Sequence, residues 1–361
     1  IKIITNEGRA MTHVVPSREK VKKAGKVLIK EDATTDEFND AMAVLSQWRA
    51  LHSYTINTFQ AMLRGKVKQL GFKSPIIAQR LKRTPSIIRK LNRFPTMSLS
   101  RMQDIGGIRI VLPTVNDVYR LHNDIIKTKA RFDHEPLLPA DDYIERPKDD
   151  GYRSLHQVFK YKSAIAPELN GLFIELQIRT KLQHSWATAV ETLGLVEKSS
   201  FKTGEGAEEF KRFFKLASVL FAHHEKKPVI DVFSQDEPST WVAELMALEK
   251  ELQIYAKLTG LIITAKHIDN VSDKTDEYHV MELNTNGNHP AVSLVAFTKS
   301  QLELAEDFYK MREIATQDKP NIEVVLIAAG NLKDIKKAYP NYFLDTQEFI
   351  KNLKSICQKL G

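Results

Sequence analysis

The sequence predicts a globular α/β protein of two domains, and three observations lead to this expectation. The chain has 361 residues, more than the roughly 250–300 residues that one hydrophobic core normally serves. Hydrophobic residues make up 42% and charged residues 27% of it, a composition that excludes collagen-like, coiled-coil and largely disordered chains. Short β-branched or alternating segments also follow amphipathic helical ones, which is typical of a sheet with helices packed against it.

The first elements follow from capping residues and apolar spacing. Residues 1–35 are basic and predict an irregular N-terminal arm. Thr34 and Thr35 precede Asp36 and Glu37 as in a capping box, and apolar residues then recur at helical spacing, so a long helix is expected to run to about Leu63. A second helix is expected from Thr84, where Pro85 suits the first helical position.

The strands and the domain plan come next along the chain. Strands are expected at 107–112, 154–161 and 172–178, with a helix over 115–128 between the first two. Residues 226–240 form the candidate linker, which divides the chain into an arm (1–35), a first domain (36–227) and an acidic α+β domain (228–361). The last domain is expected to contain helices at about 241–258, after Lys299, at 331–338 and at 345–356, and strands at 278–284, 291–298 and 322–328.

Charge differs sharply between the two halves of the chain. Residues 1–230 contain 39 Lys and Arg against 25 Asp and Glu, a net charge of +14, whereas residues 231–361 contain 14 against 20, a net charge of −6. Residues 41–103 contain no acidic residue and carry twelve Lys and Arg. Such a surface attracts polyphosphates or nucleic acid, although a solvated basic helix face would have the same composition.

The single Cys357 excludes an intramolecular disulfide and a cysteine-based zinc site. The sequence shows neither an apolar run of about 20 residues nor the apolar core of a signal peptide at its start, so we expect no membrane partner and a cytoplasmic protein.

The segment 172–180 carries polar residues on one face of an apolar strand. Alternation places Glu175, Gln177 and Arg179 on the face opposite Ile174 and Leu176. A carboxylate, an amide and a guanidinium on a central strand are costly unless they meet ligands or each other. An edge strand with a solvated face is the alternative.

Asp104 lies just before the strand at 107–112 and beside Gly106 and Gly107, which allow close backbone approach. It could share a Mg²⁺ ion with Glu175, because hard cations prefer carboxylate oxygens and leave positions open for phosphate. An Asp before two glycines is also a common turn residue.

Two further clusters predict nucleotide binding. Arg80 and Lys82 precede the helix at Thr84, and Ser86 and Lys90 share one face near its N-terminus, which suits an anion unless this is an ordinary basic helix. In the loop 142–156, the ring of Tyr152 could face a nucleobase, with Lys148, Arg153 and His156 near its phosphates. Packing roles for Tyr152 and His156 are equally compatible with the pattern.

The four segments occur in the order of a known family. R-x-K-x-x-x-S-x-x-x-K (80–90), D-I-x-G-I-R (104–109), YIERPKDDGYRSLH (143–156) and E-x-Q-I-R-T (175–180) resemble the RelA/SpoT-type alarmone synthetase domain over about residues 45–225. The resemblance implies a nucleotidyltransferase-like mixed sheet flanked by helices. It also implies transfer of the β,γ-diphosphate of ATP to the 3′-hydroxyl of GDP or GTP.

The resemblance further implies individual roles. Arg80 and Arg109 would sandwich the adenine of ATP, while Lys82, Ser86 and Lys90 would hold its phosphates. Asp104 and Glu175 would bind Mg²⁺, and Glu175 would be the general base. The acceptor would be bound by a third group: Lys148, Asp150, Tyr152, Arg153, His156, Gln177 and Arg179.

One departure leaves the acceptor open. The family commonly has Asn two residues before the Tyr of the loop, where this chain has Asp150. A carboxylate at this position could accept hydrogen bonds from guanine N1–H and N2–H₂ or could face water. An adenosine nucleotide is a further acceptor to consider. The hydrolase domain of bifunctional members is not recognisable and no His-Asp dipeptide occurs, so no alarmone hydrolysis is expected.

Other functions stay open beside this one. Toxic members of the family pyrophosphorylate the 3′ end of tRNA, and the basic tract 41–103 would suit a tRNA backbone. The acidic domain 228–361 could then be a fused antitoxin-like regulator of a phage-defence protein. Oligomerisation is possible. A binding module without activity is disfavoured because both Asp104 and Glu175 are present, and the missing GxxxxGK[ST] string excludes a P-loop kinase.

Overall fold

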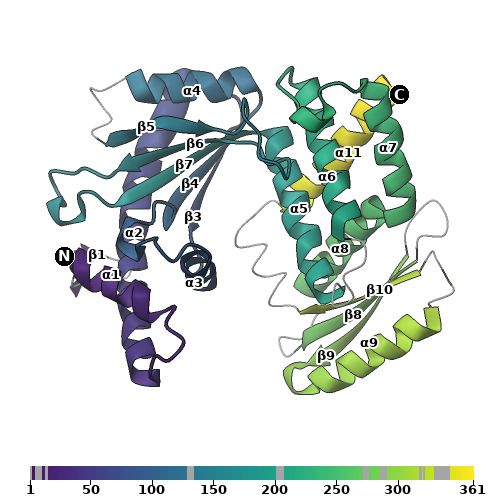
Figure 1. The fold of residues 1–361 in the computed structure, drawn as a ribbon, viewed down its shortest axis with the longest axis horizontal. Coiled ribbons are helices and arrows are strands. Elements are labelled where there is room, and N and C mark those ends of the chain that lie inside the picture. The colour runs from purple at the N-terminus through teal and green to yellow at the C-terminus, as the bar shows by residue number, and fades with distance from the viewer. Residues whose placement is uncertain are drawn as a thin grey trace. The chain divides into compact units, whose positions relative to one another are not determined.

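The computed structural model describes residues 2–4, 10–12, 15–127, 134–200, 207–270, 276–284, 291–316, 319, 322–328 and 342–361. The chain divides into two compact units, the first formed by Ile1–Tyr143 and Ser154–Thr180 and the second by Ile144–Arg153 and Lys181–Gly361. Both units combine helices with a sheet, which confirms the predicted α/β class (Figure 1). None of the helices in the described ranges is long and apolar enough to cross a membrane.

The first unit is built on a mixed five-stranded sheet of order β3-β4-β7-β6-β5. Only β4 and β7 pair in parallel, and the other neighbours are antiparallel. Its strands are β3 (Ile76–Leu81), β4 (Gly106–Leu112), β5 (Glu135–Asp142), β6 (Leu155–Lys160) and β7 (Phe173–Thr180). Its helices are α1 (Arg18–Val27), α2 (Thr35–Leu70), α3 (Thr84–Arg93) and α4 (Val115–Lys127), with short 3₁₀ turns at Leu99–Arg101 and Pro167–Leu169. A small ribbon pairs β1 (Lys2–Ile4) with β2 (Ala10–Thr12).

The long helix α2 begins and ends as its sequence dictates. The Oγ1 of Thr34 accepts from the Glu37 amide at 3.2 Å, and the Glu37 carboxylate accepts from the Thr34 amide at 2.9 Å, which completes the predicted capping box. The helix continues past Leu63 because Val67 is buried in the core. It ends at Gly71, whose φ of 66° is readily adopted only by glycine.

The expectation of an irregular arm over residues 1–35 is wrong, because this segment contains the β1–β2 ribbon and α1. Ser17 accepts from the Lys20 amide and caps α1, whose Val21 and Ala24 are buried against α2. The helix packs tightly, since a Cβ on Gly25 would lie 2.6 Å from the Cβ of Leu99. Basic residues dominate this segment because only a narrow side of α1 faces the core.

The sequence pattern does not predict two strands of the five-stranded sheet, β3 and β5, and both lie at its edges. β3 is half-exposed along its length, so its apolar residues do not alternate with polar ones. β5 contains Pro136 and Pro139, which weaken a strand signal and are tolerated at an edge. The segment 331–338, where a helix was expected, lies outside the described residues.

The second unit surrounds an aromatic-rich helical core. Its helices are α5 (Lys181–Ser200), α6 (Ala207–His224), α7 (Pro238–Leu252), α8 (Ile254–Asn270), α9 (Leu302–Thr316) and α11 (Tyr342–Leu360). Its antiparallel sheet has the order β10-β8-β9, from β8 (Asp276–Asn284), β9 (Ala291–Thr298) and β10 (Ile322–Ala328). Short 3₁₀ turns occur at Asp231–Phe233 and Lys299–Gln301.

The predicted linker at 226–240 does not separate the compact units. Phe233 in this segment is fully buried in the same core as Phe213 and Phe221 of α6 and Trp241 of α7. Helices α5 and α6 therefore pack with the C-terminal helices, and the division falls at Thr180. The net charge of the chain changes sign near residue 230, but the hydrophobic core of the second unit continues across this position.

Candidate active site

Polar side chains gather on one face of the first sheet, across its central strands. Strand register places Gly107 of β4 between Arg80 of β3 and Glu175 of β7. In the next row, Arg109 lies beside Gln177, which lies beside His156 of β6. Residues that pair across strands share a face, so five residues expected at the site form one surface.

The opposite face of the same strands is apolar and explains why the polar face is available. Ile108, Ile110, Ile174 and Leu176 are buried, and α2 and α4 pack against β4 and β7. A Cβ on Gly106 would lie 3.1 Å from both His52 and Ile56 of α2, which shows how closely the helix covers this side. The two faces of β4 are therefore divided between packing and polar chemistry, as its alternation predicts.

Glu175 is held by two donors in the middle of the polar face. The Nδ1 of His156 lies 3.0 Å from its Oε1, and the Nε2 of Gln177 donates to its Oε2 at 2.7 Å. Burial raises the pKa of Glu175, but these hydrogen bonds and the positive charge of Arg80 outweigh burial and bring it down to about 2. Glu175 is thus an ionised carboxylate at neutral pH.

Gln177 also forms a hydrogen bond with Arg179 of the same strand. The Nη2 of Arg179 donates to the Oε1 of Gln177 at 3.0 Å, which leaves the Gln177 amide nitrogen to face Glu175. Arg179 is 2% exposed and Arg109 is 4% exposed. Both guanidinium groups are therefore part of the floor of the site rather than of its rim.

A second carboxylate, Asp104, meets two ammonium groups just before β4. The Nζ of Lys82 lies 2.7 Å and the Nζ of Lys90 lies 2.9 Å from its Oδ2. Burial raises the pKa of Asp104, but the two lysines lower it by more, so the group stays charged. The residues expected to hold phosphate are thus joined to one of the two expected metal ligands.

Arg49 of α2 lies outside the predicted motifs, yet it holds the backbone of Lys82 beside Asp104. Its Nε donates to the backbone carbonyl of Lys82 at 2.9 Å. The Lys82 amide in turn donates to the Ile105 carbonyl at 2.8 Å, beside Asp104. In the sequence Arg49 is one of the twelve basic residues of the tract 41–103, and composition alone does not connect it to a strand some thirty residues later.

Arg80 and Ser86, which are expected to bind ATP, differ in exposure. Arg80 is exposed at the edge strand, whereas Ser86 is half-buried in the first turn of α3, one turn before Lys90. The helix begins at Thr84, Pro85 lies in its first turn, and no side chain caps it. An exposed guanidinium beside an uncapped helix N-terminus suits a ligand that carries both a planar base and phosphates.

The carboxylates fit a hard divalent cation. The Oδ1 of Asp104 is buried and has no hydrogen-bond partner, and the lowered pKa values keep Asp104 and Glu175 ionised. Among the described residues no group of three or more His, Cys, Asp or Glu side chains is arranged as a metal site. A metal ion here would therefore take most of its ligands from substrate and water.

A histidine and an aspartate do meet elsewhere, although no His-Asp dipeptide exists. In the second unit the Nε2 of His184 lies 3.1 Å from the Oδ2 of Asp345, and each side chain is only 8% exposed. The pair joins α5 to α11 in the interior. It is a packing contact of the helical core and has no third acidic or histidine ligand beside it in the described structure.

Four residues expected to bind the acceptor belong to the second unit. They lie in the loop 144–153, and Lys148 places its Nζ 5.1 Å from the centre of the Tyr152 ring. The Oδ1 of Asp150 accepts from the Tyr152 amide at 2.9 Å, so this carboxylate shapes the turn at Gly151, whose φ is 93°. The Asn-to-Asp departure from the family thus retains a local structural role.

Arg153 does not have the open position that acceptor binding requires. It is 3% exposed, its Nε donates to Ser218 at 3.2 Å and its Nη1 donates to the Ile144 carbonyl at 3.0 Å. Ser218 also donates to the Gly151 carbonyl at 2.6 Å. The structure therefore assigns Arg153 to anchoring the loop on α6, in place of the expected contact with an acceptor.

Comparison with known proteins agrees with the motifs. The family model described as "Region found in RelA / SpoT proteins" matches residues 79–204. The GTP pyrophosphokinase YjbM of Bacillus subtilis is 31% identical over 147 residues, which cover 37% of this chain and 68% of that protein. The GTP pyrophosphokinase of Escherichia coli K12 is 30% identical over 171 residues, which cover 47% of this chain and 21% of that longer protein.

A solved structure is similar to part of the chain. The crystal structure of the small alarmone synthetase 1 from Bacillus subtilis aligns with 50% of this chain and 92% of that chain, with 25% identity and a TM-score of 0.42. The region matched by the family model crosses Thr180, so it contains β3 to β7 of the first unit and also α5 of the second.

Proposed function

Because this chain belongs to the RelA/SpoT family of pyrophosphotransferases, we propose that it transfers the β,γ-diphosphate of ATP to the 3′-hydroxyl of GDP or GTP. The relatives named above are GTP pyrophosphokinases, which supports guanosine nucleotides as acceptors. The observations that carry the proposal are two ionised carboxylates, Glu175 on the polar sheet surface that Arg80 shares, and Asp104 bound by Lys82 and Lys90 just before β4.

The donor end of the reaction is assigned to β3, α3 and the start of β4. Arg80 and Arg109 would contact the adenine of ATP, and Lys82, Ser86 and Lys90 would bind its phosphates. Positive charge is needed here because the transferring group gains charge on its equatorial oxygens in the transition state. Lys82 and Lys90 contact Asp104 and would exchange this contact for phosphate oxygens.

Asp104 and Glu175 would hold Mg²⁺, as the unpartnered Oδ1 of Asp104 and the two ionised carboxylates allow. The ion supplies neutralisation of charge on the diphosphate as it moves between oxygens. The protein would contribute one ligand just before β4 and one on the adjacent parallel strand β7, and so position the donor before the acceptor arrives.

At the acceptor end, Glu175 would receive the proton of the 3′-hydroxyl. A carboxylate with a pKa of about 2 is a weak base, so it first orients the hydroxyl by accepting its hydrogen bond. Proton transfer would follow late, when bond formation has made the hydroxyl more acidic. His156 and Gln177 keep the carboxylate in place, and Lys148, Asp150 and Tyr152 would contact the acceptor nucleotide.

The 3′ end of tRNA is the second candidate acceptor, because the acid-free tract 41–103 forms α2, β3 and α3 and contributes exposed cations such as Arg83, Arg89 and Arg93. An adenosine nucleotide is the third candidate acceptor. In the tRNA case the acidic segment 228–361 could act as the regulator.

The test is to offer ATP labelled at the β-phosphate with GDP, GTP, adenosine nucleotides and deacylated tRNA separately, in the presence of Mg²⁺. Label on GDP or GTP is expected, and a fall of roughly 10²–10⁴-fold is expected for Glu175→Gln. Glu168→Gln, which changes an exposed carboxylate of the same unit, should behave as the wild type. Label on tRNA alone would replace the proposal with the second candidate.

A further inference from the structure

Arg179 ends the row of polar residues on β7 and is its most deeply buried member. Residues two apart on a strand share a face, so Glu175, Gln177 and Arg179 form one row with a spacing of roughly 7 Å. Glu175 is partly exposed, whereas Gln177 and Arg179 are buried. The hydroxyl of an acceptor can therefore reach Glu175, while the guanidinium of Arg179 lies beneath the surface.

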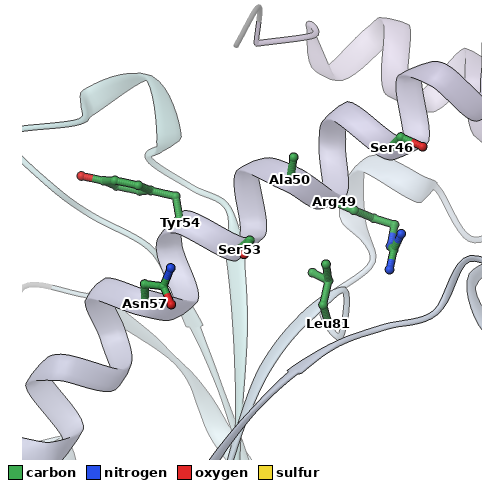
Figure 2. A pocket seen from close by; sticks show the side chains of 7 residues that line it. All are labelled: Ser46, Arg49, Ala50, Ser53, Tyr54, Asn57 and Leu81. Carbon is green, nitrogen blue, oxygen red and sulfur yellow. The ribbon is translucent and has the colours of Figure 1, made fainter. Parts of the chain in front are cut away.

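This row is separate from a cleft of about 430 Å³ between α2 and β3. The cleft is lined by α2 residues between Ser46 and Asn57 and by Leu81 of β3 (Figure 2). Among the described residues, none from β7 lines it. A molecule in that cleft would therefore not contact Arg179, whose hydrogen bond to Gln177 lies on its own strand.

The hydrogen bonds along the row have a fixed direction, because the groups at its two ends have opposite capacities. A guanidinium only donates, so the Nη2 of Arg179 faces the Oε1 of Gln177, at 3.0 Å. The carboxylate of Glu175 accepts, so it faces the Nε2 of Gln177, at 2.7 Å. A half-turn of the amide would place oxygen against carboxylate and nitrogen against guanidinium. Arg179 and Glu175 together therefore select one orientation of Gln177.

Loss of the guanidinium would change the partners of Gln177. The amide oxygen of Gln177 would lose its donor, and a buried acceptor without a partner is unfavourable. Arg109 lies beside Gln177 on the neighbouring strand and offers another donor. The amide would turn toward Arg109, and its bond to Glu175 would weaken.

The orientation of Glu175 depends on a donor at each of its two oxygens. His156 contacts the Oε1 at 3.0 Å, and Gln177 donates to the Oε2. With one donor gone, the carboxylate can rotate about its last bond, and the lone pair that would accept from the acceptor hydroxyl loses its direction. A displacement of about 1 Å at reacting atoms can cost about a hundredfold in rate.

We propose that Arg179 is a positioning residue for diphosphate transfer, which holds the amide of Gln177 so that Glu175 stays aimed at the acceptor hydroxyl. The inference rests on the proposed function, in which Glu175 receives the proton of that hydroxyl. It replaces the direct contact between Arg179 and the acceptor that the family resemblance implies. It applies equally to a free nucleotide and to the 3′ end of an RNA.

A split between kcat and KM distinguishes positioning from acceptor binding. Arg179→Met keeps much of the aliphatic volume and removes the donor, so kcat is expected to fall about 10–100-fold while KM for the acceptor stays within about twofold. Arg179→Lys keeps one donor and should recover part of kcat, and it replaces Arg179→Met if that variant does not unfold cooperatively. A raised KM with unchanged kcat would overturn the proposal.

A double-mutant cycle tests whether Arg179 acts through Gln177. Gln177→Leu removes the amide, so adding Arg179→Met to it should lower kcat by no more than about a further twofold. The guanidinium then has no amide left to hold. Losses that multiply in the double variant would show that Arg179 acts independently of Gln177, which would overturn the proposal.

The side-chain amide of Gln177 gives a readout that needs no substrate. Its NH₂ signal in the ¹⁵N-labelled, perdeuterated full chain is identified by its loss in Gln177→Leu. In Arg179→Met this signal should shift and exchange with solvent roughly tenfold faster or more. Ser154→Ala, the matched control, removes a buried hydroxyl that donates to the Ile178 carbonyl of the same strand at 3.3 Å. It should leave both this signal and kcat as in the wild type.

The two readouts separate a failure of this inference from a failure of the proposed function. An unchanged Gln177 signal in Arg179→Met, or an equal change in Ser154→Ala, would overturn the role of Arg179 whatever the activity. Absence of label transfer by the wild type would overturn the proposed function, and the Gln177 signal would still show whether Arg179 holds the amide.

Discussion

Glu175 and Asp104 are charged for different reasons, and each reason can be tested at the level of the residue. Glu175 accepts from a histidine and an amide, whereas Asp104 is bound by two ammonium groups. ATP phosphates compete for the lysines but not for the amide. We therefore expect Asp104 to change partners during the reaction and Glu175 to keep those that orient it.

The depressed pKa of Glu175 predicts a pH-dependent stability. The usual value of 4.5 applies to the unfolded chain and about 2 applies to the folded one, so the unfolded chain binds more protons between these values. The stabilisation is fully present above pH 4.5 and is lost as the pH falls toward 2. Urea unfolding from pH 5 to 2.5 should show this loss in the wild type.

Glu175→Gln is the matched comparison, because it keeps the shape and removes the titration. The difference in the free energy of unfolding between the two proteins should narrow by up to about 3 kcal/mol over the same interval. Parallel pH profiles of the two proteins would mean that the His156 and Gln177 contacts do not depress this pKa.

Arg153 provides the second prediction at this scale. Arg153→Met keeps much of the buried aliphatic volume but leaves Ser218 and the Ile144 carbonyl without their donor, so the free energy of unfolding should fall by roughly 2–4 kcal/mol. Chemical denaturation measures this. Arg146→Met, at an exposed position of the same loop, is the control. Unchanged stability together with a raised KM for the acceptor would restore the ligand role.

At the level of elements, β4 separates packing from chemistry by two adjacent glycines. A Cβ on Gly106 would meet His52 and Ile56 at 3.1 Å, whereas a Cβ on Gly107 would lie 3.3 Å from the carbonyl oxygen of Glu175. The methyl group of an alanine at position 106 would therefore enter the core beneath α2, and that of an alanine at position 107 would enter the polar surface between Arg80 and Glu175.

The two alanine variants should fail differently. Gly106→Ala is expected to lower the free energy of unfolding by about 1–3 kcal/mol, because the core must shift to admit the methyl group. Gly107→Ala is expected to lower kcat/KM for ATP roughly ten- to hundredfold with a smaller change in stability. Chemical denaturation and initial-rate measurements on both variants compare the effects. If both variants lost the same stability and neither lost rate, the separation of a packing face and a polar face on β4 would be contradicted.

The elements also show where local patterns suffice. α2 was predicted from its capping box and its apolar spacing, and both are present in the structure. α1 was missed because its buried stripe is narrow, and β3 and β5 were missed because edge strands alternate weakly. A helix or strand can be predicted from its sequence pattern when one whole face of it is buried against a single neighbouring element.

At the level of the whole molecule, the compact units do not follow the charge boundary. Removing residues 231–361 would delete α7, α8 and α11, which share one core with α5 and α6. Phe213, Leu216 and Phe221 would then be exposed to water. Such a truncation is therefore expected to be insoluble or to bind a hydrophobic dye, rather than to reveal an unregulated enzyme.

Expression of residues 1–230 tests this, with soluble yield, cooperative unfolding and label transfer as measurements beside the full chain. A soluble, cooperatively folded fragment with raised transfer activity would contradict it and would favour inhibition by the acidic segment. Regulation by that segment is better tested by point variants on its surface, because these leave the shared core intact.

The motif residues, their family and the polar face of β7 follow from the sequence alone, because alternation along a strand and spacing along a helix are local properties. The partners of those residues do not. Arg49 reaches Lys82, Arg153 turns away to Ser218, and the compact units divide at Thr180 only because distant segments pack together. Burial and hydrogen bonding between residues far apart in the chain are decided by the tertiary structure, since they depend on which surfaces exclude water together.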